Sequence, residues 1–188
     1  MNPASQGGDG PRKRNELRAH PDRQPDHMNI VVANRQRAKR INTRSLKRMV
    51  KEVFAELAVT EAELGINLVA DREMTLVNET FLQHVGTTDV ITFDHANRRG
   101  RGRGKRRKIH GELFVCVDVA AAQAGEFKTS WQSEVVRYVI HGILHLLGHD
   151  DLNPRLRREM KREENRLVRL MEQRFSFAEL SRMAKIRP

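Results

Sequence analysis

The stretch SWQSEVVRYVIHGILHLLGHDD, residues 130–151, decides the fold. Its valines, isoleucines and leucines recur at helical spacing and form one broad apolar face, which predicts a helix over residues 130–147. Gly148 ends this helix, because glycine takes the left-handed conformation of a helix stop at low cost. Two aspartates follow at positions 150 and 151. We therefore expect a central helix with an acidic turn after it.

The other side of this helix carries two histidines four residues apart, His141 and His145. At this spacing their imidazole rings lie one above the other. Two ring nitrogens so placed can reach one zinc ion at about 2.0 to 2.1 Å each. Asp151, in the turn, stands at the distance where a third ligand would fall. The competing interpretation is a pair of histidines that face solvent, but the glycine stop and the acidic pair favour a metal site on the central helix and its turn.

Gly142 follows the first histidine. Zinc peptidases with the motif H-E-x-x-H place a glutamate at this position, where it acts as the general base. A peptidase of that kind is therefore disfavoured. The nucleophile must instead be activated by the metal or come from the substrate.

The composition indicates a nucleic-acid partner. The 188 residues carry a formal net charge of +11, and a surface of this kind attracts polyanions such as RNA. The single cysteine excludes a disulfide framework and a multi-cysteine zinc finger. No apolar run approaches the roughly 20 residues of a membrane span, so we expect no membrane association. The N-terminus lacks the apolar segment of a secretory signal, so we expect a cytoplasmic protein.

Strands and helices alternate in the first part of the chain, and helices dominate the second. This order predicts an α/β (α+β) fold with a small mixed sheet of about four strands flanked by helices. The expected strands are residues 28–34, 64–70, 89–95 and 109–118. The expected helices are residues 42–57, 71–82, 119–127 and 130–147, one from 153 onward, and a weak one over 176–186.

Three segments follow from composition. Residues 1–27 are polar and charged and should be a disordered tail. The folded, metal-dependent domain is expected over residues 28–175, with a C-terminal helix or tail over 176–188. Inside the domain, residues 97–108 read NRRGRGRGKRRK and should form a mobile loop that contacts phosphates without sequence preference. Its candidate RNA-binding residues are Arg98, Arg99, Arg101, Arg103, Lys105, Arg106, Arg107 and Lys108.

On these residues the chain resembles the YbeY family of bacterial endoribonucleases, the rRNA maturation factors. The resemblance covers about residues 28–172 and rests on TDVITF (88–93), GELFVC (111–116) and SEVVRYVIHGILHLLGHDD (133–151). It implies a single-strand-specific, zinc-dependent endoribonuclease with one zinc ion per chain. It also implies a role in maturation of the 3′ end of small-subunit rRNA and in ribosome quality control. The implied partners are ribosomal RNA, the small ribosomal subunit and its proteins.

The chain departs from the family pattern at the third ligand. The family has a histidine there, and this chain has Asp151. Aspartate is a competent zinc ligand at about 2.0 to 2.2 Å. We therefore predict a site of His141, His145 and Asp151, with His149 as the alternative third ligand.

A second departure concerns activity. The family carries an arginine where this chain has Leu82. A cation near the scissile phosphate stabilises the charge that develops in the transition state. His84 is our candidate catalytic residue for this role, and an arginine of the 97–108 run is the alternative. The loss of the arginine also keeps open a non-catalytic RNA-binding assembly factor with a structural metal, or a metallohydrolase with another substrate.

Overall fold

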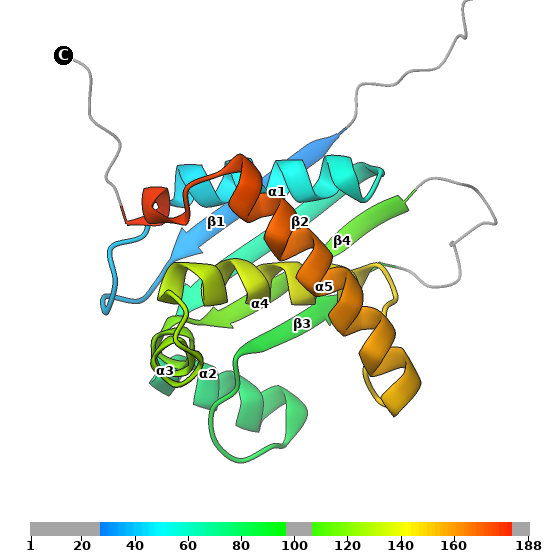
Figure 1. Ribbon diagram of the computed structural model, residues 1–188. Helices are drawn as coiled ribbons and strands as arrows, with labels where there is room; N and C mark the ends of the chain where they lie inside the picture. Colours follow the sequence, from blue (N-terminus) through cyan, green and yellow to red (C-terminus); the bar gives the residue numbers. More distant parts are fainter. Residues whose placement is uncertain (1–26, 97–106, 182–188) are drawn as a thin grey trace, which may run out of the picture.

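The computed structural model describes residues 27–96 and 107–181, and places four strands in one mixed sheet (Figure 1). The strands are β1 (Met28–Asn34), β2 (Val59–Val69), β3 (Val90–Asp94) and β4 (Arg107–Cys116). Their order is β1-β2-β4-β3, with β1 and β4 parallel to β2 and with β3 antiparallel to β4. The predicted mixed α/β fold with a four-stranded sheet is confirmed.

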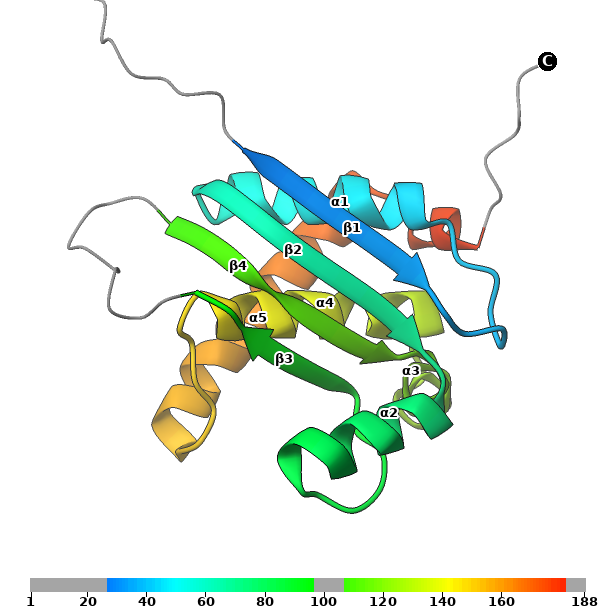
Figure 2. The same cartoon turned by 180° about the vertical axis from the view of Figure 1, so that it is seen from behind.

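Helices lie mainly on one face of this sheet. Seen from behind, in Figure 2, the strands stand in front of α1, α4 and α5. The helices are α1 (Thr43–Glu56), α2 (Asp71–Val77), α3 (Val117–Phe127), α4 (Trp131–Leu146) and α5 (Pro154–Arg174). A π-helical turn, Asn78–Leu82, extends α2, and a 3-10 turn, Phe177–Leu180, follows α5. None of the helices among the described residues is long and apolar enough to cross a membrane.

Side-chain N-caps mark the starts of the two helices that position the site. The oxygen of Ser130 accepts a hydrogen bond from the backbone N–H of Ser133 at the start of α4. Asn153 accepts two such bonds, from Arg155 and Leu156, and Pro154 occupies the first turn of α5. These caps satisfy N–H groups that have no partner within the helix. The Asn153 cap also fixes where α5 begins after the turn that carries Asp151.

The main core lies between one face of the sheet and helices α1, α4 and α5. The opposite face carries ion pairs such as Lys108–Glu61, and beside α2 it carries a second, smaller apolar cluster that includes Met74, Ile91 and Cys116. Gly142 of α4 is buried against β4, where an added Cβ would lie 2.6 Å from Cδ2 of Leu113. The absence of a glutamate after His141 therefore has a packing cause, because this position faces the sheet and has no room for a side chain.

The basic run ends inside the sheet rather than in a loop. Arg107 and Lys108 form the start of β4, since they pair with Val59 and Glu61 of the longer β2. Arg107 also donates a hydrogen bond to the carbonyl of Leu57, at 3.3 Å. The expectation of a loop as far as residue 108 was wrong for these two residues. Arg98, Arg99, Arg101, Arg103, Lys105 and Arg106 lie outside the described residues.

Candidate metal centre

The two helix histidines and the turn aspartate come together, as their spacing predicts. One ligand atom from each of His141, His145 and Asp151 lies within 4.8 Å of the others. The Nε2 atoms of the two histidines are 3.1 Å apart, and Nε2 of His145 is 4.0 Å from Oδ1 of Asp151. Donors this close can bind one ion, since zinc takes nitrogen and oxygen ligands at about 2.0 to 2.2 Å. These residues can therefore bind a metal together.

The outer nitrogen of each ring faces an oxygen that can only accept a hydrogen bond. Nδ1 of His141 lies 2.9 Å from Oε2 of Glu164, and Nδ1 of His145 lies 3.1 Å from the carbonyl of His149. Both Nδ1 atoms must therefore carry hydrogen. In neutral rings the lone pairs of the two Nε2 atoms then face each other, which is unfavourable unless a cation lies between them. The donor set thus fits a metal ion, and the outer hydrogen bonds fix both rings for it.

Glu164 is a buried carboxylate surrounded by cationic or protonated groups. Besides His141, its Oε1 accepts hydrogen bonds from Nη1 of Arg137 at 2.6 Å and from Nζ of Lys161 at 3.0 Å. Burial raises the pKa of Glu164, but the bonds from His141, Arg137 and Lys161 outweigh it and lower the pKa to about 2. The carboxylate is therefore ionised at neutral pH. It can hold the Nδ1–H of His141 in place.

Burial and the neighbouring His141 lower the pKa of His145. A lowered pKa favours the neutral ring, which is the form that binds metal. Tyr138 lies about two turns before His145 on α4, and its hydroxyl donates to Oε1 of Gln123 at 2.7 Å. Burial and the carboxylate of Asp89 raise the pKa of Tyr138, so that its hydroxyl stays protonated at neutral pH.

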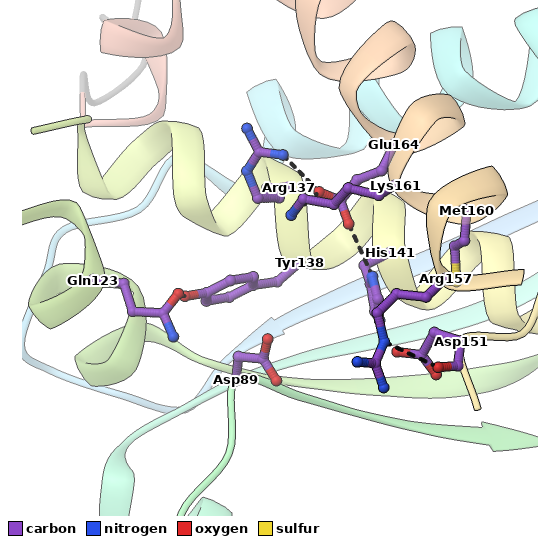
Figure 3. Close-up of a pocket in the computed structure, with 10 residues that line it drawn as sticks. All are labelled: Asp89, Gln123, Arg137, Tyr138, His141, Asp151, Arg157, Met160, Lys161 and Glu164. Carbon is purple, nitrogen blue, oxygen red and sulfur yellow. Dashed lines mark hydrogen bonds and ion pairs between the residues drawn. The ribbon is translucent and has the colours of Figure 1, made fainter. Parts of the chain in front are cut away.

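A cleft of about 440 Å³ contains part of this cluster (Figure 3). Its volume lies in the range of small-ligand sites. One side is formed by α5 residues and another by side chains from α3, from α4 and from Asp89, the residue before β3. The lining residues are Asp89, Gln123, Arg137, Tyr138, His141, Asp151, Arg157, Met160, Lys161 and Glu164.

Other residues singled out from the sequence lie elsewhere. His149 is not in the ligand group and contributes its backbone carbonyl to His145 instead. His84 is exposed after the π-helical turn and does not line the cleft. Leu82 is 42% exposed at the end of the same turn. The catalytic role of His84 remains a prediction.

Sequence reasoning did not identify which residues of α5 line the cleft. Glu164 had one usable signal, because it falls in the stripe of positions that α5 otherwise buries with apolar side chains. A charged residue at such a position needs buried partners. Arg157 and Lys161 had no signal that distinguished them from the other basic residues of this helix.

The fold and the cluster together define a mixed α/β protein with a potential two-histidine, one-aspartate metal centre on its central helix. Within that class, the chain belongs to the endoribonuclease YbeY family, whose model matches residues 31–172.

Individual relatives agree with this assignment. A Myxococcus xanthus protein named endoribonuclease YbeY is 34% identical over 145 residues, which make up 77% of this chain and 48% of that protein. The chain thus spans about half the length of that relative. A Parabacteroides distasonis protein of the same name is 31% identical over 131 residues, 70% of this chain and 87% of that one. The solution structure of a Thermotoga maritima protein that is 24% identical to this chain matches it with a TM-score of 0.57. The match covers 84% of this chain and 97% of that one, and it shows a likeness of fold.

Proposed function

We propose that this chain is a single-strand-specific, zinc-dependent endoribonuclease of the cytoplasm. Its role would be maturation of the 3′ end of small-subunit rRNA and ribosome quality control, with rRNA, the small subunit and its proteins as partners. The observation that carries the proposal is the convergence of His141, His145 and Asp151 beside a cleft, in a chain of the endoribonuclease YbeY family. The net charge of +11 suits an RNA substrate.

The residues divide the work in a defined way. His141, His145 and Asp151 would hold one zinc ion, which when bound supplies Lewis-acid chemistry to a phosphodiester. Glu164 and the carbonyl of His149 orient the two rings. The substrate brings its own 2′-hydroxyl, so a protein base is not required if that group is the nucleophile. Water is the alternative nucleophile.

The ligand set is tested by the metal content of purified variants. We expect about one zinc per chain in the native protein and after His149→Ala, but loss of zinc after Asp151→Ala. Elemental analysis measures this directly. Zinc lost only after His149→Ala would transfer the third ligand to that residue. No zinc in any preparation, even after zinc is supplied, would contradict the metal site.

Activity is tested with a single-stranded RNA and a duplex of the same sequence. We expect cleavage of the single strand, loss of cleavage on chelation, and recovery when zinc is returned. His145→Ala should abolish cleavage without unfolding the protein, which circular dichroism checks. Cleavage that persists in the chelated protein would contradict the proposal.

One observation favours a second candidate, an RNA-binding assembly factor with a structural metal. Leu82, an exposed apolar residue, stands where the resemblance places an arginine. A factor of this kind would keep its RNA affinity through chelation and through His145→Ala, and would leave the RNA intact throughout. Running the binding and cleavage assays on the same samples separates the two functions.

A further inference from the structure

Three cationic side chains line the cleft beside the metal ligands, and two of them are already engaged. Arg137 donates to Glu164 and to Asn165, and Lys161 donates to Glu164. The buried Glu164 carboxylate thus takes up much of the charge that either could offer to a bound anion. Arg157 is different, because no hydrogen bond or ion pair joins it to Glu164 (Figure 3).

Arg157 is held by the turn that carries the third ligand. Its Nε donates a hydrogen bond to the backbone carbonyl of Asp151, at 3.2 Å. No residue in the described part of the chain accepts a hydrogen bond from either of its Nη atoms. An arginine anchored through Nε presents its remaining N–H groups in a fixed direction, and a guanidinium fork matches the oxygens of a phosphate.

The charges around the cleft favour an anion on this side. Asp151 brings a negative charge to the ligand group. The site together with its ion therefore carries less positive charge than a site of three neutral histidines. A second cation beside it restores attraction for a phosphate. The carboxylate of Asp89 also lines the cleft, and its Oδ1 accepts a hydrogen bond from the backbone N–H of Val90 at 2.8 Å. A phosphate is repelled by Asp89 and attracted by Arg157.

We propose that Arg157 binds the non-bridging oxygens of the RNA phosphodiester that reaches the His141, His145 and Asp151 cluster. This rests on the proposed endoribonuclease function and adds a substrate-contacting residue to it. The ligand class is a phosphodiester of single-stranded RNA. Arg157 supplies the cation that neither Leu82 nor His84 brings into the cleft.

The test compares Arg157→Ala with Arg158→Ala in the zinc-loaded, full-length protein. Arg158 is the matched control, because it lies on the same helix, is exposed and does not line the cleft. Each variant is measured for zinc content and for kcat and KM on a single-stranded RNA. Its affinity is measured for a 2′-O-methyl RNA, and a gel checks that this RNA stays intact during the measurement. Arg157→Lys is measured in parallel.

We expect Arg157→Ala to keep its zinc and to lose about 100-fold in kcat, as when one donor to a developing anion is removed. Arg158→Ala should cleave at the native rate. Arg157→Lys should fall between the native protein and Arg157→Ala, because lysine keeps the charge but not the paired N–H groups. Arg157→Ala should also bind the 2′-O-methyl RNA more weakly than Arg158→Ala.

Two results would overturn the proposal. Equal kcat in Arg157→Ala and Arg158→Ala would remove Arg157 from the substrate. Loss of zinc in Arg157→Ala would mean that the residue acts by holding the backbone of Asp151. If the native protein does not cleave RNA, the proposed function fails, and the affinity comparison still decides whether Arg157 binds a phosphodiester.

Discussion

Glu164 occupies a core position of α5, where the helix otherwise buries Met160, Leu167, Val168 and Met171. Such a carboxylate is costly to bury unless it is paired and hydrogen-bonded. Three donors satisfy it, and one of them is the ring of a predicted metal ligand. An apolar residue would pack as well here, so core packing alone does not explain a glutamate. Orientation of His141 does explain it.

Glu164→Gln should weaken zinc binding by about 10- to 100-fold, since a hydrogen-bond partner of a metal-ligating histidine has this effect. The amide is similar in size but has lost the charge that fixes the ring. Competition with a chelator of known affinity measures the change. Glu163→Gln is the control, because Glu163 pairs with Arg166 and not with a ligand. Equal zinc affinity in the two variants would contradict the role given to Glu164.

The sequence predicts the metal ligands better than their surroundings, for a physical reason. His141, His145 and Asp151 lie on one helix and the turn after it, where helix geometry and one glycine stop determine their positions. Glu164 and Arg157 reach the site from α5, and the packing of α5 against α4 brings them there. No local pattern contains that packing, so these two residues could not be placed from the sequence.

At the scale of elements, α4 is restricted by its contact with β4. The Cβ that Gly142→Ala adds would lie 2.6 Å from Cδ2 of Leu113, a side chain that is itself fully buried. Gly142→Ala should therefore lower the free energy of unfolding by about 1 to 3 kcal/mol, the usual cost of overpacking a core. Urea denaturation measures it. Metal binding should weaken as well, since His141 precedes this glycine.

Gly125 of α3 provides the matched comparison. An added Cβ meets nothing within 4 Å there, and the residue is exposed. Gly125→Ala should raise the free energy of unfolding by up to about 1 kcal/mol, because alanine favours the helix more than glycine does. The same glycine-to-alanine change should thus have opposite effects on the free energy of unfolding in the two helices. If both substitutions were stabilising, the close contact between α4 and β4 would be wrong.

The elements themselves were largely predictable, and their limits were less so. Hydrophobic periodicity and caps such as Asn42 located the helices and strands, because both signals are local. The start of β2 at Val59 was missed, since pairing with β4 extends this strand beyond its own apolar run. The same pairing includes Arg107 and Lys108 in β4.

For the whole molecule, we expect the distribution of charge to determine how RNA is bound. The eight basic residues between positions 98 and 108 account for most of the net charge of +11. Further cations lie on α1, namely Arg44, Lys47, Arg48 and Lys51. A general electrostatic field would make the two groups equivalent. If the 98–108 group contacts phosphates directly, its loss should change the salt dependence of binding more than loss of the α1 group, because each phosphate contact releases counterions.

Two variants with equal loss of charge separate these cases. One replaces Arg98, Arg99, Arg101 and Arg103 with serine, and the other replaces the four cations of α1 with glutamine. The slope of log Kd against log salt for a single-stranded RNA should fall by up to about 3 in the first variant, at about 0.7 for each lost contact. The second variant should change it little. Equal slopes in both variants would assign RNA binding to net charge alone, and would remove the basic run from the interface.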